Sequence, residues 1–171
     1  GTEIKIKKVL VRELGKKRDV SLPSDVVTDN WQEIIGDPGI KIIVEVMGGI
    51  EPARTYVMEA LSKGKNVVTA NKDLLAEHGR ELFEKSKEAG CDLYFEASVA
   101  GGIPIISPLK QSLIANNIQQ VMGIVNGTTN YILTRMTREG MAFNQALKRA
   151  QELGYAEADP TSDVEGYDAA R

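Results

Sequence analysis

The sequence has few of the residues that stabilise secreted or disulfide-rich proteins. Its 171 residues include one cysteine, Cys91, and one histidine, His78. A single cysteine excludes an internal disulfide and is typical of a reducing cytoplasm. The sequence also has no Cys-x-x-Cys motif, no apolar run near the roughly 20 residues that cross a bilayer, and no apolar N-terminal stretch typical of a signal peptide. We therefore expect a cytoplasmic protein that does not bind a membrane.

An excess of charge of either sign is also lacking. The sequence has 21 lysine and arginine residues against 24 aspartate and glutamate residues, a net charge of −3 with both signs well mixed. No nucleic-acid partner is predicted, because the longest basic cluster, Lys16-Lys17-Arg18, is more typical of a solvated turn. The hydrophobic share of 42% is enough for a buried core in a chain of one or two domains.

Short apolar runs alternate with amphipathic stretches in the first two-thirds of the chain. This alternation is typical of a parallel sheet with helices packed on it, so we predict an α/β fold with a Rossmann-like, doubly wound parallel sheet. Asn71 is expected to cap the second helix and Gly90 to end it. Strands are predicted at 4–11, 40–46, 66–69 and 92–96, and helices at 52–63 and 71–89.

The pattern changes after Glu96, where residues 97–104 are small and glycine-rich. We place a domain boundary in this stretch. It separates an incomplete Rossmann-like domain at 1–98 from the start of an α+β domain at 99–171. In the second domain we predict a helix at 105–115, a strand at 118–125, a tight polar turn at 126–129, and helices at 130–139 and 144–153.

The residues expected at the carboxyl ends of the strands are of types that suit a nucleotide. A doubly wound sheet binds its ligand at this edge, and Arg12, Gly48, Gly49 and Asn71 all follow predicted strands. Glycine lets a backbone approach a phosphate or ribose closely. The sequence has no Gly-x-Gly-x-x-Gly turn, so a dinucleotide site needs a first βα unit upstream of Gly1. Arg12 would then favour the 2′-phosphate of NADP, and an ordinary surface arginine is the equal alternative.

The end of the sequence is rich in carboxylates. Pro160 breaks any helix across this run, so we predict a loop that attracts a cation, with an amino-acid ammonium as a candidate. A solvated acidic turn is the alternative. A calcium-binding EF-hand is excluded, because placing Gly166 sixth puts the required twelfth ligand beyond Arg171. Five carboxylates lie within twelve residues: Glu157, Asp159, Asp163, Glu165 and Asp168.

Four stretches, in this order and at this spacing, resemble homoserine dehydrogenase, which interconverts L-homoserine and L-aspartate 4-semialdehyde with NAD(P). The resemblance covers essentially the whole chain, as an internal segment of a longer enzyme. The chain differs from the family at both ends: it has neither the glycine-rich cofactor turn nor the lysine of the family's Asp-x-Ala-Arg-Lys pattern. The four stretches are Thr69-Ala70-Asn71-Lys72-Asp73-Leu74, Glu96-Ala97-Ser98-Val99-Ala100-Gly101-Gly102-Ile103-Pro104, Val125-Asn126-Gly127-Thr128-Thr129-Asn130 and the acidic end from Gly154.

The resemblance implies a role for each of these motifs. Lys72 and Asp168 would be catalytic, and the proton donor would be the lysine expected just after Arg171. The cofactor, NADP or NAD, would be bound by Arg12, Gly48, Gly49, Asn71, Lys72 and Gly154. The substrate would be bound by Gly127, Thr128, Tyr155, Glu157, Asp163 and Asp168. A structural sodium ion would be bound by Glu96 and the main-chain oxygens of Val99, Gly101 and Ile103.

Several of these residues also have a purely structural interpretation. Lys72 can extend into solvent, although a lysine in the first turn of a helix is electrostatically disfavoured. The glycine-rich stretch after Glu96 can be a hinge, and Thr128 or Thr129 can simply cap the next helix. Cys91 is expected to be a buried thiol rather than an aldehyde-oxidising nucleophile, because no activating residue is near it in the sequence.

The function expected from the resemblance is homoserine dehydrogenase activity in threonine, methionine and isoleucine biosynthesis. The intact enzyme would be a homodimer. We expect this chain alone to be inactive, because the phosphate-binding turn and the proton donor lie outside it. Two alternatives remain open: another NAD(P)-dependent oxidoreductase of Rossmann architecture, and a non-catalytic amino-acid-binding module.

Overall fold

The computed structural model describes residues 3–171, and the chain forms two compact units, Gly1–Ile106 and Ser107–Arg171. The division between the units falls a few residues after the glycine-rich stretch. The functional domain boundary predicted between 98 and 99 stays a prediction. Within the described residues, no helix is both long and apolar enough to cross a membrane.

The first unit contains two small parallel sheets. Strand β1 (Val9–Leu10) pairs with β2 (Val27–Thr28), and the second sheet has the order β3-β4-β5, with bounds Ile42–Glu45, Asn66–Thr69 and Leu93–Tyr94. All pairings are parallel, and each connection within the second sheet contains a helix, as parallel strands require. The α/β fold with a parallel sheet is therefore confirmed.

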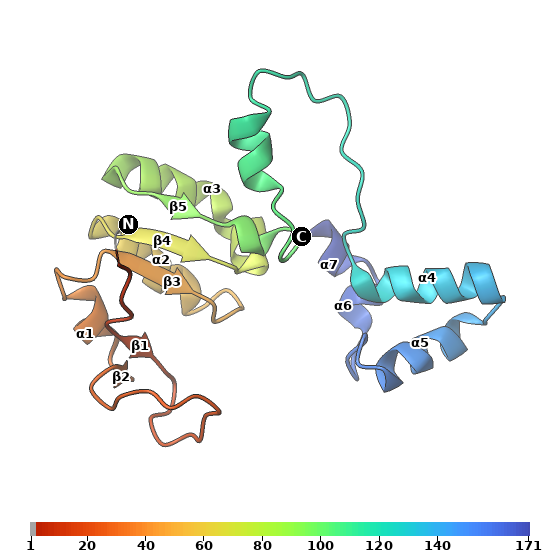
Figure 1. The fold of residues 1–171 in the computed structure, drawn as a ribbon, viewed down its shortest axis with the longest axis horizontal. Coiled ribbons are helices and arrows are strands. Elements are labelled where there is room, and N and C mark those ends of the chain that lie inside the picture. Colours follow the sequence, from red (N-terminus) through yellow and green to blue (C-terminus); the bar gives the residue numbers. More distant parts are fainter. Residues whose placement is uncertain (1–2) are drawn as a thin grey trace. The chain divides into compact units, whose positions relative to one another are not determined.

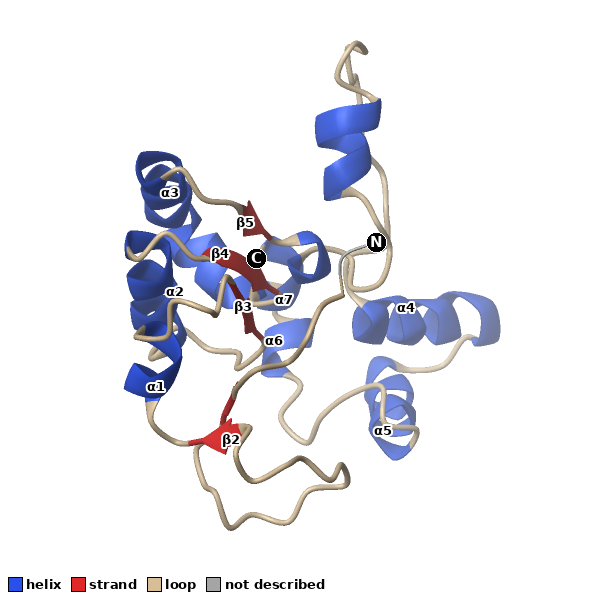
Figure 2. Ribbon diagram, turned by 60° about the vertical axis from the view of Figure 1, so that its left-hand side comes forward, coloured by secondary structure: helices blue, strands red, loops and turns tan. Residues whose placement is uncertain are grey.

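Helices cover one face of the three-stranded sheet (Figure 2). They are α1 (Trp31–Ile35), α2 (Ala53–Ser62) and α3 (Lys72–Ala89). Strand positions alternate between the two faces, so the side chains of β3 and β4 that point toward the helices are buried with them. The resulting core consists of Ile35, Ala53, Val57, Ala60, Leu61, Val67, Leu74 and Leu82.

The opposite face of the same sheet carries apolar side chains that remain exposed. On β3, Val44 is 65% exposed and Ile42 nearly half exposed, and Tyr94 of β5 is also exposed. Val44 is in register with Val68, which is in register with Tyr94, so these side chains form one row. The first unit therefore buries only one side of its main sheet.

Helix α3 forms as the sequence predicts. The Asn71 side chain accepts a hydrogen bond from the Leu74 backbone N–H, and Gly90 ends the helix in the left-handed region at φ 65°. The strand predicted from residue 4 is shorter than expected, since only Val9–Leu10 pairs with a neighbour. Neither β2 nor α1 was predicted, because both are short and lie next to a polar, proline-containing loop.

The second unit is helical (Figure 1). Helices α4 (Gly127–Glu139) and α5 (Phe143–Glu152) pack together, followed by the short helices α6 (Thr161–Val164) and α7 (Tyr167–Ala170). A small core forms between α4, α5 and the segment after α5. It consists of Ile132, Ala146, Ala150 and Ala156.

Two predictions for the second unit were wrong. The stretch 118–125 is not a strand: it has no partner strand among the described residues, and its Met122 is 83% exposed. A strand needs a neighbour for its backbone hydrogen bonds, which the apolar pattern alone does not provide. The helix predicted at 105–115 is present but shorter, as a π-helix at Pro108–Ser112. The acidic end is two short helices rather than a loop, because Pro160 precedes α6 and Gly166, at φ 79°, separates α6 from α7.

Candidate active site

The loop after β3 places two glycines at the end of the strand. Gly48 and Gly49 have φ angles of +74° and +70°, a region that favours glycine over residues with a Cβ. The space around them is open, since a Cβ added at either position would have no heavy atom within 4 Å. A phosphate or ribose could therefore approach this backbone closely.

Asn71 connects this loop to the start of α3. Its Nδ2 donates to the Gly49 carbonyl oxygen at 2.6 Å, and its Oδ1 accepts from the Leu74 backbone N–H at 3.1 Å. The residue is buried, so loss of either bond would leave a polar group unpaired. The cap predicted from the sequence is confirmed, and the bond to Gly49 is visible only in the fold.

A buried carboxylate lies next to this arrangement. Glu45 is 3% exposed, and its two oxygens accept from Thr69 Oγ1 at 2.6 Å and from the Met47 backbone N–H at 2.7 Å. Thr69 Oγ1 accepts in turn from the Asn71 backbone N–H at 3.0 Å. Glu45 was not predicted as a site residue. A carboxylate inside an apolar strand was nevertheless a signal, because burial requires it to be hydrogen-bonded.

The other residues predicted at the cofactor lie in different places. Lys72 is the first residue of α3 and is half-buried, at the positive end of the helix dipole. Arg12 is exposed and follows Val11, whose backbone N–H donates to the carbonyl oxygen of Thr28, the last residue of β2. Gly154 belongs to the second unit, just after α5, with φ 77°. The roles predicted for these residues stay predictions.

The glycine-rich turn after β5 presents several oxygen atoms. Glu96 begins a 3₁₀ turn, and its Oε1 accepts from the backbone N–H groups of Ile105 and Ile106 at 2.6 and 2.7 Å. Ala100 has φ 56°, in the left-handed region. Within the described residues, the backbone hydrogen bonds inside this turn use the carbonyls of Glu96 and Ala100 as acceptors. They do not use those of the three residues predicted as sodium ligands, Val99, Gly101 and Ile103.

In the second unit, Asn126 brings together two residues of the acidic end. Its Nδ2 donates to Asp163 Oδ1 and to Asp168 Oδ2, each at 2.7 Å. Its Oδ1 accepts from both the backbone N–H and the hydroxyl of Thr129, at 2.8 and 2.7 Å. Asp163 and Asp168 were predicted to belong to one site, but the residue that joins them was not predicted as part of it.

Asn126, not a threonine, is the N-cap of α4. The alternative in which Thr128 or Thr129 serves as the cap is therefore wrong, because the helix begins earlier, at Gly127. Thr128 has a different contact: its hydroxyl donates to the carbonyl oxygen of Tyr155 at 2.5 Å. The Tyr155 ring stacks on that of Tyr131, with ring centroids 4.9 Å apart. The start of α4 thus contacts both the Tyr155 segment and the carboxylates of the acidic end.

Two further carboxylates lie on the same segment. The side chain of Glu157 is exposed, and its backbone carbonyl accepts from Gln151 Nε2 at 3.1 Å. Among the described residues, the Asn126 amide donates to Asp163 and Asp168 and not to the Glu157 carboxylate. Asp159 accepts from the hydroxyl and the N–H of Thr161, and these bonds lower the pKa of Asp159 below its usual value. Asp159 therefore stabilises the start of α6.

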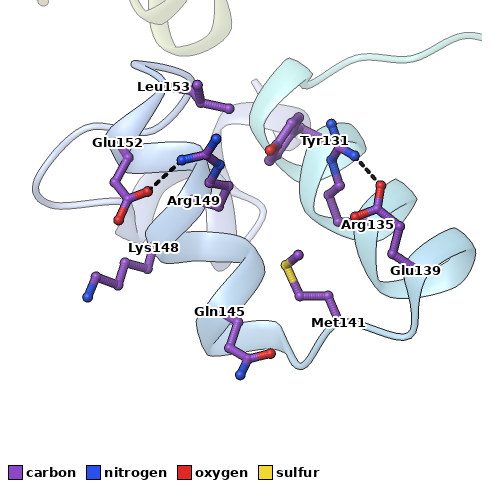
Figure 3. Close-up of a pocket in the computed structure, with 9 residues that line it drawn as sticks. All are labelled: Tyr131, Arg135, Glu139, Met141, Gln145, Lys148, Arg149, Glu152 and Leu153. Carbon is purple, nitrogen blue, oxygen red and sulfur yellow. Dashed lines mark hydrogen bonds and ion pairs between the residues drawn. The ribbon is translucent and has the colours of Figure 1, made fainter.

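A cavity of about 440 Å³ lies between α4 and α5 (Figure 3). Four of its charged side chains pair within each helix, Arg135 with Glu139 and Arg149 with Glu152. Neither Asp163 nor Asp168 lines it. The cavity is therefore separate from the arrangement around Asn126.

The lone cysteine does not have the features of a nucleophile. Cys91 is half-buried against the first core, and burial raises the pKa of its thiol. Its Sγ lies 3.7 Å from the Leu61 carbonyl oxygen. Within residues 3–171, no group of three or more Cys, His, Asp or Glu side chains is arranged to hold a metal ion.

Comparison with known families gives two matches that together cover most of the chain. Residues 1–96 match the NAD-binding domain of homoserine dehydrogenase, and residues 104–171 match the homoserine dehydrogenase domain. The first unit thus contains an NAD-binding domain of this kind.

Curated relatives match the chain along its length. Homoserine dehydrogenase of Bacillus subtilis is 56% identical over all 171 residues, which cover 40% of that protein. The Synechocystis enzyme is 54% identical over 98% of the chain, which covers 39% of that protein. The chain therefore spans about 40% of the length of these relatives.

Solved structures match the fold as well. A crystal structure of Staphylococcus aureus homoserine dehydrogenase aligns with a TM-score of 0.83 and 51% identity, covering 99% of this chain and 42% of the other. A hyperthermophilic archaeal homoserine dehydrogenase in complex with NADPH aligns with a TM-score of 0.73 and 36% identity, covering 82% of this chain and 43% of the other. Sequence and fold thus agree, and the chain belongs to the homoserine dehydrogenase family.

Proposed function

We propose that this chain is a segment of a homoserine dehydrogenase that interconverts L-homoserine and L-aspartate 4-semialdehyde with NAD(P). The observation that carries the proposal is the pairing of Asp163 and Asp168 through Asn126 at the start of α4. Two adjacent carboxylates held by hydrogen bonds at the start of a helix suit the ammonium group of an amino-acid substrate. The family match extends over the same residues.

The first unit would bind the cofactor. The open Gly48-Gly49 backbone suits a phosphate or ribose, and Asn71 holds Gly49 in place. Arg12 would favour the 2′-phosphate of NADP over the free hydroxyl of NAD. The relative solved with NADPH supports the same cofactor class.

The sheet of this domain would be completed by a strand from an upstream segment. In a doubly wound sheet of order 3-2-1-4-5-6, strand 1 lies between strands 2 and 4. The observed orders, two strands in β1-β2 and three in β3-β4-β5, correspond to the strands on either side of that central strand. The upstream strand and the Gly-x-Gly-x-x-Gly turn after it would supply the remaining pyrophosphate contacts.

The second unit would bind homoserine through Asp168 and Glu157, with Asp163 in the same acidic set. Tyr155, Gly127 and Thr128 would line the site. Oxidation of homoserine removes a hydride from C4 to the nicotinamide and the hydroxyl proton to a base. By resemblance that base is the lysine following Arg171, assisted by Lys72.

Two further properties follow from the family resemblance. A sodium ion would be held by Glu96 and the carbonyl oxygens of Val99, Gly101 and Ile103, because hard cations prefer carboxylate and carbonyl ligands. The intact enzyme would be a homodimer.

The experiment is to follow NADP reduction with homoserine as substrate. The protein extended at both ends to the length of its relatives should reduce NADP. The 171-residue chain should not, because it contains neither the phosphate-binding turn nor the proton-donor lysine. Failure of the extended protein to use homoserine would contradict the proposal. If it instead used a different hydroxy acid, another oxidoreductase would be indicated. Homoserine binding that does not respond to cofactor, measured by calorimetry, would indicate a binding module.

A further inference from the structure

Asn126 uses its entire hydrogen-bonding capacity in the structure. A side-chain amide has two N–H donors and one carbonyl acceptor with two lone pairs. Both donors of Asn126 go to carboxylates, and its Oδ1 accepts two bonds from Thr129. The side chain is 8% exposed. Its orientation is therefore fixed by four contacts.

The two carboxylates come from different elements. Asp163 lies in α6 and Asp168 in α7, and they are 37 and 42 residues from Asn126 in the sequence. Two carboxylates held this close repel each other, and a hydrogen bond donated to each of them offsets the repulsion. The amide of Asn126 supplies a donor to each, so it holds the two short helices against the start of α4. Helices of four residues have little stability of their own, and this contact compensates for that.

We propose that Asn126 is a positioning residue for the substrate site: it fixes Asp168, together with Asp163, in the orientation that binds the ammonium group of the substrate. The inference rests on the proposed function, because it assigns to Asp168 a contact with homoserine. Asn126 itself acts through the carboxylates and does not need to touch the substrate.

The capping role of Asn126 can be separated from this positioning role. Serine and aspartate are both good N-cap residues, so Asn126→Ser and Asn126→Asp keep an acceptor for Thr129. Serine is too short to bridge the two carboxylates. Aspartate keeps the shape of the side chain but replaces the donor with a third negative charge. Because both variants keep the cap, any loss of substrate binding in them reports on the hydrogen bonds that Asn126 donates to Asp163 and Asp168.

The experiment uses the protein extended at both ends, with NADP and homoserine. Both variants should raise the KM for homoserine about tenfold or more, because bonds to charged groups are among the stronger hydrogen bonds. The KM for NADP should change less than about twofold, because the proposed role of Asn126 concerns the substrate alone. For Asn126→Asp, the homoserine KM should recover toward the parent value as the pH falls. The introduced carboxyl would lie beside two carboxylates that raise its pKa, and once protonated its single O–H can donate to one of them. Asn126→Ser should show no such recovery.

Asn30 provides a matched control. It caps α1, where its Oδ1 accepts from the Gln32 backbone N–H at 3.0 Å. Asn30→Ser and Asn30→Asp should leave both KM values unchanged. An equal rise in the KM values for homoserine and NADP in the Asn126 variants, or the same effect from Asn30→Ser, would overturn the proposal.

Hydrogen–deuterium exchange tests the same inference without activity. Asn126→Ser should speed the exchange of amides in 161–170 at least about tenfold, since exchange of a locally opened segment follows its opening free energy. The amides of α4 should keep their protection. If the parent enzyme does not use homoserine, the proposed function fails. Independently of activity, unchanged exchange of the amides in 161–170 in Asn126→Ser would overturn the positioning role.

Discussion

Asn71 in the first unit and Asn126 in the second have the same position relative to the helix that follows. Each is buried and accepts with Oδ1 from a backbone N–H in the first turn, Leu74 in one case and Thr129 in the other. Each also uses its amide nitrogen to hold a second segment. Asn71 holds the carbonyl of Gly49, whereas Asn126 holds two carboxylates. Under the proposed function, the first contact fixes a loop for a phosphate, and the second fixes paired carboxylates for the ammonium group of the substrate.

The two units differ in how much apolar surface they bury. The first has a core of eight buried residues around α2, α3 and the sheet, whereas the second has only four around α4 and α5. The second unit also exposes the apolar stretch 118–125, which makes no strand pairing among the described residues. Burial of apolar surface is the main favourable term in folding, so the first unit should be the more stable when the chain is studied alone.

The largest expected effect is on the free energy of unfolding of the first unit. Leu61→Ala should lower it by about 2–5 kcal/mol, because the side chain is fully buried and its loss leaves a cavity. Trp31 reports on this unit alone, since its ring stacks on Tyr56 beside the core. Urea unfolding followed by Trp31 fluorescence measures the change.

The matched variant in the second unit is Ile132→Ala. It should lower the stability of α4 and α5, measured by circular dichroism, and leave the Trp31 transition in place. An equal shift of the Trp31 transition by Ile132→Ala would mean that the two units unfold together, which would contradict the comparison.

An intermediate effect is expected from Asn71→Ser in the extended enzyme. Serine keeps the cap of α3 but cannot reach Gly49, so the KM for NADP should rise up to about tenfold. The KM for homoserine should stay within about twofold of the parent value, the reverse of the Asn126 variants. Steady-state kinetics with each substrate varied in turn measures both constants. If Asn71→Ser raised the KM for NADP and the KM for homoserine equally, the two asparagines would not serve separate ligands.

The smallest effect concerns the ion pair that joins α2 to α3. Arg54 Nη2 donates to Glu81 Oε2 at 2.9 Å, which, with a smaller contribution from His78, holds the pKa of Glu81 below its usual value. A lowered pKa stabilises the folded state above the unfolded glutamate value of about 4.3, and this contribution is lost as the pH falls through the folded value. Glu81→Gln should therefore be slightly less stable than the parent at pH 7 and equal to it in acid.

Glu139→Gln is the control for this pair, because Glu139 binds Arg135 within the single helix α4. Urea titrations at pH 7 and near pH 3 compare the two variants with the parent. Pairs at the surface contribute little, so Glu139→Gln should have no measurable effect. A loss of stability in Glu81→Gln that did not depend on pH would mean that the Glu81 side chain stabilises the fold by packing and not by its charge.

Local signals predicted the parts of the fold that depend on neighbouring residues. Asn71, Gly90 and the periodicity between them gave α3 its bounds, since capping and helical amphipathicity act over a few residues. The stretch 118–125 shows the limit of this reasoning. Its apolar pattern fits a strand, but strand formation depends on a partner that can come from anywhere in the chain or from another chain.

The candidate site shows the same difference between local motifs and contacts of distant residues. The motifs containing Lys72, Glu96, Asn126 and Asp168 were visible in the sequence and were sufficient to indicate the family, because they are short and specific in their order. Glu45 and the bridging role of Asn126 were not predicted. Each depends on a hydrogen bond between residues more than twenty positions apart.

The sequence by itself thus determined the α/β class, the helices with strong caps and the family of this protein. Only the tertiary structure decided which polar groups satisfy one another: Glu45 with Thr69, Asn71 with Gly49, and Asn126 with Asp163 and Asp168. The physical reason is that a polar side chain needs a partner once it is buried. Which partner it finds depends on how the chain brings distant segments together.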